Sequence, residues 1–184
     1  MTAAREAPLP PIERLDRLPA GVFAATMAPL FEGAPRFLDR LAKARPFGSL
    51  EVMFERARQI AHAMPVAEQL ELIDAHPRLG APPADVSPLS FVEQGYDRQP
   101  AAAAADRDRV AAELVRLNAA YEDRFGFRYC VFVDGRTRAE LLPGLAAALD
   151  AGRADEIDRA LDAVIDSARD RAARLGTAAR EETP

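Results

Sequence analysis

Apolar residues recur every three or four positions along most of the chain, which places them on one face of an α-helix. Residues 50–61 show the pattern clearly, with Leu50, Phe54, Ala57, Ile60 and Ala61 at helical spacing. The chain is also rich in alanine, leucine and arginine, which favour helix. The spacing predicts helices over residues 12–18, 20–31, 36–44, 50–62, 65–76, 101–124, 137–149 and 154–175.

Residues that cap or stop helices separate these segments. His76-Pro77 ends one predicted helix, because the residue before a proline disfavours helical backbone. Ser49 is expected to cap the helix that follows it, since its hydroxyl can accept from a free first-turn N–H. Ser90, with Glu93 three residues later, is expected to cap a short helix as part of a capping box.

Residues 125–133 break the helical pattern. The segment reads Phe-Gly-Phe-Arg-Tyr-Cys-Val-Phe-Val and ends at an Asp-Gly turn. Aromatic and β-branched residues favour extended backbone, but no second segment offers an obvious partner strand. We therefore expect an extended, buried segment whose backbone groups bond to something other than a strand, with a ligand as one candidate.

Pattern and length together predict one all-α domain. The chain has 184 residues, enough for a single domain with a substantial core. We expect a single-domain helical bundle over residues 20–175, with the one extended aromatic segment at about 125–133. Residues 1–19 are expected to form a loose leader and residues 176–184 a frayed tail.

The net charge and the cysteine content limit which partners the protein can bind and which cellular compartment we expect for it. The net charge is −5, and no basic patch with interleaved aromatics supports nucleic-acid binding. No apolar run reaches the roughly 18 residues of a membrane span. Cys130 is the only cysteine, so no internal disulfide can form and a reducing compartment, the cytoplasm, is the default. One cysteine and two histidines do not make an ordinary structural zinc site.

Candidate chemistry concentrates around His76. An imidazole titrates near neutrality and suits proton delivery. Pro77 holds the backbone beside it, and Ser90, Glu93 and Gln94 follow a short loop later. Simpler roles stand beside these: His76 could interact only with carbonyls at its helix end, and Glu93 could serve only in the capping box. Gln94 has no part in capping and is the more suggestive residue.

The other histidine and the cysteine are weaker candidates for a catalytic role. No comparable cluster of polar residues accompanies His62 in the sequence, and we interpret it as a surface or core histidine. Cys130 lies in an apolar segment and is interpreted as a small core residue. No Ser-His-Asp or Cys-His set is evident, which argues against a hydrolase.

Several motifs, taken in order, match one family. They are Arg45-Pro46-Phe47, His76-Pro77-Arg78-Leu79-Gly80, Ser90-x-x-Glu93-Gln94 and Leu117-Asn118-x-x-Tyr121-x-x-Arg124-Phe125-Gly126-Phe127. A weaker match is the final helix with Glu156 and Arg171. With these motifs, from about residue 20 to 175, the chain resembles the 2-oxo-4-hydroxy-4-carboxy-5-ureidoimidazoline (OHCU) decarboxylases of urate breakdown.

The resemblance implies an all-α homodimer that converts OHCU to (S)-allantoin in urate (purine) catabolism, with no metal or organic cofactor. The unsaturated group beside the carbon that loses carbon dioxide can hold the electron pair. His76 would then be the proton donor, and Glu93 would orient or deprotonate the substrate hydroxyl. The residues implied to surround the substrate are Pro77, Ser90, Phe91, Val92, Gln94, Tyr129, Cys130, Val131, Phe132, Val133 and Arg171.

The chain departs from the family pattern near these residues. Residues 95–98 read Gly-Tyr-Asp-Arg where an Ala-Gly pair is common, and Arg128 and Ala148 stand where proline and arginine are usual. Two alternatives therefore accompany OHCU decarboxylation. One is decarboxylation of a related or alkylated ureidoimidazoline, and the other is a catalytically silent helical binding module. Polar side chains that converge on one pocket would favour an enzyme, whereas Glu93 used only as a cap would favour the module.

Overall fold

The computed structural model describes residues 8–97 and 104–181, and in these ranges the chain is largely helical with no strand. The α-helices are α1 (Ile12–Leu15), α2 (Ala20–Met27), α3 (Pro35–Lys43), α4 (Leu50–Ala63), α5 (Val66–Asp74), α6 (Pro88–Glu93), α7 (Ala104–Phe125), α8 (Arg138–Ala148) and α9 (Arg153–Glu181). Two 3₁₀ turns, η1 (Ala28–Phe31) and η2 (Pro83–Asp85), lie between them. The predicted all-α class is confirmed. Within the described ranges, no helix has both the length and the apolar character needed to cross a membrane.

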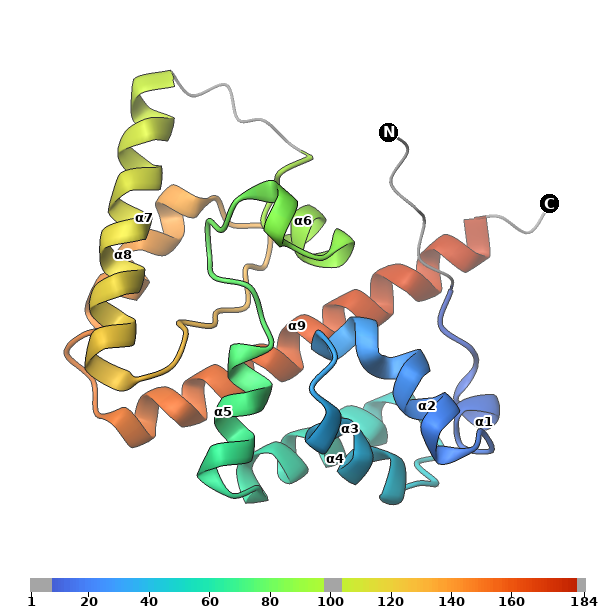
Figure 1. Ribbon diagram of the computed structural model, residues 1–184. Helices are drawn as coiled ribbons and strands as arrows, with labels where there is room; N and C mark the ends of the chain where they lie inside the picture. Colours follow the sequence, from blue (N-terminus) through green and yellow to red (C-terminus); the bar gives the residue numbers. More distant parts are fainter. Residues whose placement is uncertain (1–7, 98–103, 182–184) are drawn as a thin grey trace.

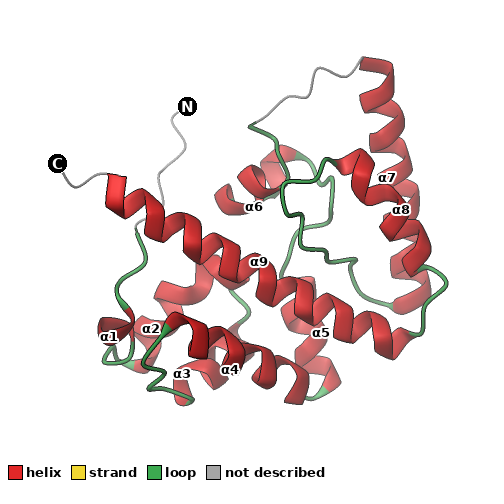
Figure 2. Ribbon diagram, turned by 180° about the vertical axis from the view of Figure 1, so that it is seen from behind, coloured by secondary structure: helices red, strands yellow, loops and turns green. Residues whose placement is uncertain are grey.

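Helix α9 is the longest element and runs diagonally through the molecule. Helices α2, α3 and α4 lie along one side of it, and α6, α7 and α8 lie on the other (Figures 1 and 2). Helix α5 packs against α9 near its middle. The loop after α7 passes between the α7–α8 pair and α9 (Figure 2). Two groups of helices therefore meet along one axis.

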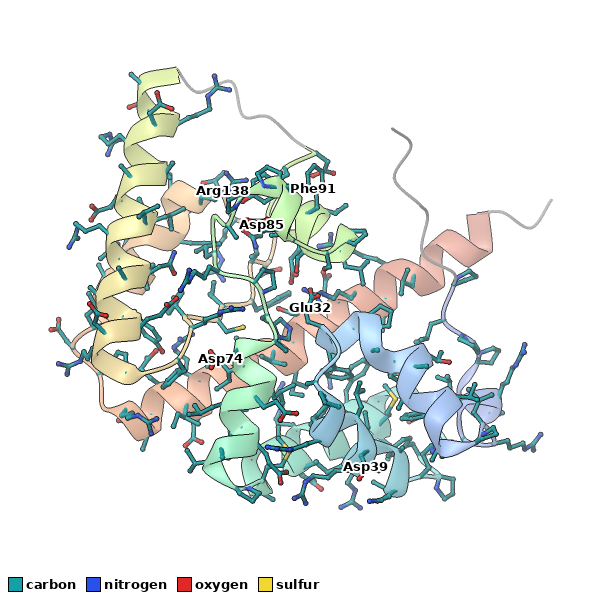
Figure 3. The ribbon with its side chains drawn as sticks, viewed as in Figure 1. Glu32, Asp39, Asp74, Asp85, Phe91 and Arg138 are labelled. Atoms are coloured by element: carbon teal, nitrogen blue, oxygen red, sulfur yellow. The ribbon has the colours of Figure 1, made fainter. Side chains whose placement is uncertain are left out.

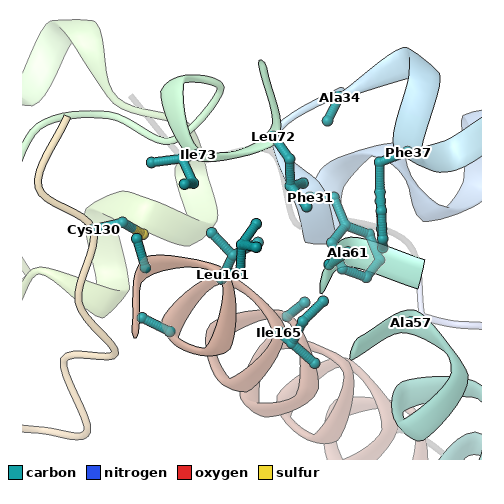
Figure 4. Close-up of a cluster of buried hydrophobic side chains, with 14 of the residues drawn as sticks. Phe31, Ala34, Phe37, Ala57, Ala61, Leu72, Ile73, Cys130, Leu161 and Ile165 are labelled. Carbon is teal, nitrogen blue, oxygen red and sulfur yellow. The ribbon is translucent and has the colours of Figure 1, made fainter. Parts of the chain in front are cut away.

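The main core forms where the apolar face of α9 meets α4, α5 and η1 (Figure 4). Leu161 and Ile165 of α9 are fully buried, together with Phe31, Phe37 and Leu72. Burying a side chain of this size stabilises the fold by about 1.5–3 kcal/mol. In α9 such residues recur every three or four positions, with charged residues between them. The spacing that predicts this helix is the spacing that fills the core.

Parts of the expected leader and of the expected tail are helical in the described residues. Helix α1 lies within the expected leader, and Leu15 in it is fully buried. The Arg45 guanidinium donates to the carbonyls of Leu15 and Leu18 at 3.0 and 2.6 Å, and Asp16 accepts from the backbone N–H groups of residues 47 and 48. Helix α9 continues to residue 181, beyond the expected start of the tail. Alanine-rich sequence there favours helix despite one glycine.

One of the predicted caps is confirmed and the other is wrong. Ser49 Oγ accepts from the Val52 N–H at 3.1 Å, as expected of the cap of α4. Helix α6, however, is capped by Ser87, whose Oγ accepts from the Ser90 N–H at 3.2 Å. Pro88 explains the difference, because proline is favoured at the first helical position and a capping serine directly precedes it. Ser90 therefore lies inside the helix, where its hydroxyl is available for other contacts.

The segment predicted to be extended is indeed non-helical, and Phe127, Tyr129, Cys130 and Val133 in it are buried. Its neighbours are helices rather than strands, so its backbone groups bond to side chains. The Arg128 N–H, for example, donates to Asp74 Oδ1 at 2.8 Å. The expectation of an extended segment without a partner strand is confirmed for the described part of the chain.

Candidate active site

His76 lies just beyond the end of α5 and is only 5% exposed. Its Nδ1 is 3.3 Å from the Leu72 carbonyl oxygen. Because a carbonyl can only accept, this contact places the imidazole proton on Nδ1. Burial, and then the charge of Arg171, lower the pKa of His76 to about 4. The ring is therefore neutral at pH 7, and its Nε2 is buried with no partner in the described residues.

Arg128 and Asp74 fix the end of α5 from which His76 projects. The Arg128 guanidinium donates to the carbonyls of Asp74 and His76 at 2.7 and 3.0 Å. Its backbone N–H donates to the Asp74 side chain, which lies at the end of α5 in Figure 3. The departure from the family pattern at Arg128 thus places a helix-end clamp on the backbone of the candidate catalytic histidine.

Helix α6 presents Ser90 and Glu93 on one face, three residues apart. Glu93 is 8% exposed, and its Oε2 accepts from Arg171 Nε and Nη2 at 3.2 and 2.7 Å. Its other oxygen, Oε1, is buried and has no partner in the described residues. Ser90 Oγ lies 2.9 Å from Arg171 Nη2. Glu93 is therefore one half of a buried ion pair rather than a helix cap.

Glu32, in the turn after η1, is a charged residue of this site that the sequence did not reveal (Figure 3). Its Oε1 accepts from the Ser87 and Ser90 hydroxyls at 2.8 and 2.6 Å and lies 2.9 Å from Arg171 Nη1. No local motif marks Glu32, because the serines that bond to it come 55 and 58 residues later in the chain.

Arg171 projects from α9 and links these groups. Besides Glu32, Ser90 and Glu93, its Nη1 reaches the carbonyls of Leu30 and Pro29 at 3.2 and 3.4 Å. Burial alone would lower the pKa of Arg171, but the charges of Glu93 and Glu32 raise it above its ordinary value. The guanidinium stays charged, and each of its three nitrogens is bonded to the protein.

Gln94 has a structural task as well as a place beside the pocket. Its Oε1 accepts from the Gly80 N–H at 2.8 Å, and its Nε2 donates to the Arg78 carbonyl at 3.3 Å. Asn118 of α7 donates to the next carbonyl of the same loop, that of Leu79, at 3.0 Å. The loop after His76 is therefore held from two helices.

A buried polar network fixes the extended segment against α9. Arg159 Nη1 donates to the Cys130 carbonyl at 2.8 Å, and its guanidinium lies 4.6 Å from the centre of the Tyr129 ring. Arg159 Nε bonds to the Glu156 carboxylate, which also accepts from the Tyr121 hydroxyl at 2.7 Å. Glu156 is only 3% exposed. Charge and hydrogen bonding thus hold the backbone that forms one wall of the site.

Three carbonyls of the same segment are already bonded within the protein. Arg136 donates to the carbonyls of Phe132 and Val133, and Arg159 occupies that of Cys130. The N–H groups of residues 129–133 donate to no group in the described part of the chain. The carbonyls of Tyr129 and Val131 also accept from no group in the described part of the chain. A ligand beside this backbone would therefore meet five N–H donors, which suit carbonyl or carboxylate oxygens, and two carbonyl acceptors.

These elements enclose one pocket. It is lined by His76, Pro77, Leu79, Ser90, Glu93, Gln94, Tyr129, Cys130, Val131, Val133, Ser167 and Arg171. Leu79 and Ser167 were not among the residues expected at the substrate. Three residues expected at the substrate lie outside this lining: Phe91, Val92 and Phe132. Phe91 packs on Tyr96 with ring centres 5.3 Å apart, and Val92 is 38% exposed.

Helical geometry explains why Phe91 and Val92 turn away while Ser90 and Glu93 face the pocket, because residues three apart share a helix face and adjacent residues do not. Phe132 is the one residue of the 129–133 segment that does not line the pocket; it packs instead against the hydrophobic core. Among the described residues, no group of three or more His, Cys, Asp or Glu side chains has an arrangement that could hold a metal ion.

Fold and site together define a helical protein in which a buried imidazole and a buried carboxylate open onto one polar pocket. The OHCU decarboxylase family model matches residues 16–173, and the chain belongs to this family. The resemblance drawn from the motifs is confirmed.

Curated relatives agree with the family match. A uric acid degradation bifunctional protein of Bacillus subtilis is 31% identical over 166 residues, which cover 90% of this chain and 33% of that protein. An OHCU decarboxylase of Haloferax volcanii is 25% identical over 157 residues, which cover 83% of this chain and 88% of the relative. The chain thus spans about a third of the length of the bifunctional relatives that it matches.

Solved structures share the fold. An OHCU decarboxylase crystallised in the presence of (S)-allantoin aligns with a TM-score of 0.62 at 24% identity, over 79% of this chain and 93% of that one. An (S)-allantoin synthase aligns with a TM-score of 0.65 at 19% identity, over 90% of this chain and 53% of that one.

Proposed function

We propose that this protein is a carboxy-lyase that converts OHCU to (S)-allantoin in urate breakdown, without a metal or organic cofactor. Family membership and the OHCU decarboxylase activity named for relatives of this chain support the reaction. The observation that carries it in this chain is a pair of buried atoms in one pocket, His76 Nε2 and Glu93 Oε1, both without partners in the described residues. Buried polar atoms are rarely left unpaired, so the two are suited to a ligand.

The substrate's own chemistry assigns roles to both groups. In OHCU one ring carbon bears both the carboxyl and a hydroxyl group. Glu93 Oε1 accepts the hydroxyl proton while the bond to the carboxylate breaks and carbon dioxide leaves. The electron pair moves into the adjacent unsaturated group of the ring, and the heteroatom of that group takes up the proton that Glu93 accepted, which returns Glu93 to its charged form. N–H donors of the 129–133 backbone bind the ring and ureido oxygens. Ser90, Gln94 and Pro77 form the rest of the substrate site.

His76 completes the reaction by delivering a proton to one face of the neighbouring ring carbon, which fixes one enantiomer. In the free protein Nε2 carries a lone pair, so His76 gains a proton before it gives one. The anionic substrate adds negative charge beside the ring, which favours that protonation. The net reaction takes up one proton and releases carbon dioxide.

Convergence of the three polar side chains supports an enzyme over a silent binding module. His76, Glu93 and Gln94 line one pocket, and Glu93 serves no cap.

The test is to mix the protein with freshly generated OHCU and follow allantoin by circular dichroism. We expect the signal of (S)-allantoin to rise faster than in a protein-free control, and equally fast after dialysis against a chelator. A rate equal to the control would overturn the proposal for OHCU. Turnover of an alkylated ureidoimidazoline in the parallel assay would then identify the alternative substrate.

We also propose that the enzyme is a homodimer that acts in the cytoplasm. The dimer rests on the family resemblance, and the compartment rests on the unpaired thiol of Cys130. Light scattering coupled to size-exclusion chromatography would show twice the 20.0 kDa chain mass. A monomer at working concentration would contradict the first part, and export in a fractionation experiment the second.

A further inference from the structure

We propose that Glu32 is a positioning residue for the reaction: through Arg171 it fixes the oxygen of Glu93 that faces the substrate. The inference rests on the proposed function and adds to it a residue that touches neither the substrate nor the reacting atoms. Glu32 is absent from the pocket lining, yet it bonds to two residues that form it, Ser90 and Arg171.

The backbone at Glu32 indicates that its side chain is held in place. Its φ is 52°, in the left-handed region that residues other than glycine seldom adopt. Gly33 follows directly with φ 86°, so two successive residues reverse the chain after η1. A glutamate persists in such a conformation only when surrounding contacts determine it.

Those contacts converge on one oxygen. The Ser87 and Ser90 hydroxyls donate to Glu32 Oε1, and Arg171 Nη1 lies 2.9 Å from it. Ser87 is the cap of α6, and Ser90 lies one turn further along the same helix. Glu32 therefore ties the start of α6 to the middle of α9, and both elements carry pocket residues.

Arg171 passes this constraint on to Glu93. One side of its guanidinium, Nη1, is docked on Glu32 and on the Leu30 carbonyl. The other side, Nε and Nη2, holds Glu93 Oε2. With Oε2 bound on this side, Oε1 is the oxygen left unpaired at the pocket. Without Glu32, Nη1 would lose its charged partner, and the guanidinium would be free to rotate toward Glu93 Oε1 or the substrate.

The charges around Arg171 also indicate that it positions Glu93. One guanidinium lies between two carboxylates, so Arg171 is already neutralised by Glu32 and Glu93 before an anion arrives. Arg171 therefore acts by holding Glu93 rather than as the main receptor for the substrate carboxylate. The free N–H groups of residues 129–133 remain for that task.

A double-mutant cycle tests the inference on the full chain. Glu32→Gln keeps the size and an acceptor oxygen but removes the charge. We expect it to lower kcat about tenfold with little change in KM, because it disturbs a transition-state contact through Glu93. In a Glu93→Gln background the same change should lower kcat less than about twofold, because the group it positions is already absent. The control Glu113→Gln, which removes an exposed ion pair with Arg116, should leave kcat unchanged in both backgrounds.

A purely structural role gives a different result. Equal fold losses from Glu32→Gln in both backgrounds, or full activity of the single variant, would overturn the inference. The dissociation constant of (S)-allantoin, which needs no turnover, should show the same non-additivity, and equal losses of binding in both backgrounds would also overturn it. Wild-type protein inactive on OHCU would instead contradict the proposed function, so the two failures are distinguishable.

Discussion

At the scale of the residue, His76 is distinguished by its surroundings rather than by its identity. The chain has two histidines. His62 is partly exposed, with its ring nitrogens 3.2 and 2.9 Å from the carboxylates of Asp158 and Asp162. His76 has one ring nitrogen bonded to a carbonyl and the other unpaired at the pocket. These differences lead to opposite expectations for the same substitution.

His76→Ala should reduce OHCU turnover by about 100-fold or more, the usual contribution of a positioned proton donor. His62→Ala, which removes only surface contacts worth about 1 kcal/mol or less, should keep nearly full activity. Initial rates of allantoin formation compare the two variants, with circular dichroism as the check on folding. Full activity in the His76 variant would contradict the mechanism.

The buried His76 also gives stability a pH dependence of defined sign. The pKa is about 4 in the folded protein, against 6.5 as the ordinary value. Between those values the unfolded chain binds the proton and the folded one does not, so stability falls as pH falls from about 6.5 to 4. The loss reaches about 3 kcal/mol at its full extent. Urea unfolding of wild type and His76→Asn at several pH values should show a difference that changes across this window. A constant difference would contradict the lowered pKa.

At the scale of the element, the extended segment depends on charges supplied by α9. Arg159→Met leaves the buried Glu156 carboxylate with the Tyr121 hydroxyl as its hydrogen-bond donor. Because the Arg159 side chain is 34% exposed, its loss should cost about 2 kcal/mol, less than the loss of one partner of a fully buried pair, and the backbone wall should shift, lowering kcat/KM. Arg116→Met removes an exposed pair with Glu113 and should cost about 1 kcal/mol or less. Denaturant unfolding measures the free energy of unfolding of both variants. Equal decreases in the two variants would contradict a stabilising role for the Arg159 network.

Helices were predictable from the sequence because their signals are local. The repeat of apolar residues, a capping Ser49 and the His76-Pro77 break all act within a few positions. The same locality explains the error at α6, where two serines compete and Pro88 favours the earlier one. It also explains why α1 could not be recognised as docked, since Arg45, which bonds to its end, lies about 30 residues away.

The candidate site was predictable only where motifs carried it. His76, Ser90, Glu93 and the extended segment stood out from the residues themselves, the family pattern gave them roles, and in the structure they line one pocket. Glu32 could not be found in this way, because its meaning lies in partners from α6 and α9 that only folding brings near. Gln94 was singled out from the sequence, but its bonds to the loop after His76 could not be predicted, because they depend on how α6 lies against that loop.

At the scale of the whole molecule, the pocket exists only when four separated parts of the chain are in place. The end of α5, helix α6, the extended segment and α9 each contribute a wall. The main core on the α4 side of α9 does not need α6. Because α6 is short and lies at the periphery (Figure 1), we expect the pocket to open more readily than the core unfolds.

The reactivity of the Cys130 thiol can report how often the pocket opens. The chain's single thiol lies in the pocket wall, and burial raises its pKa to about 12. A thiol reagent that needs the thiolate can therefore react only when the wall separates, so its rate counts openings of the pocket. We expect slow labelling of native protein, fast labelling in denaturant, and further slowing by (S)-allantoin but not by (R)-allantoin. Immediate labelling of the native protein would contradict the buried thiol. A chain with one cysteine thus gives access to the opening kinetics of its own site without an added probe.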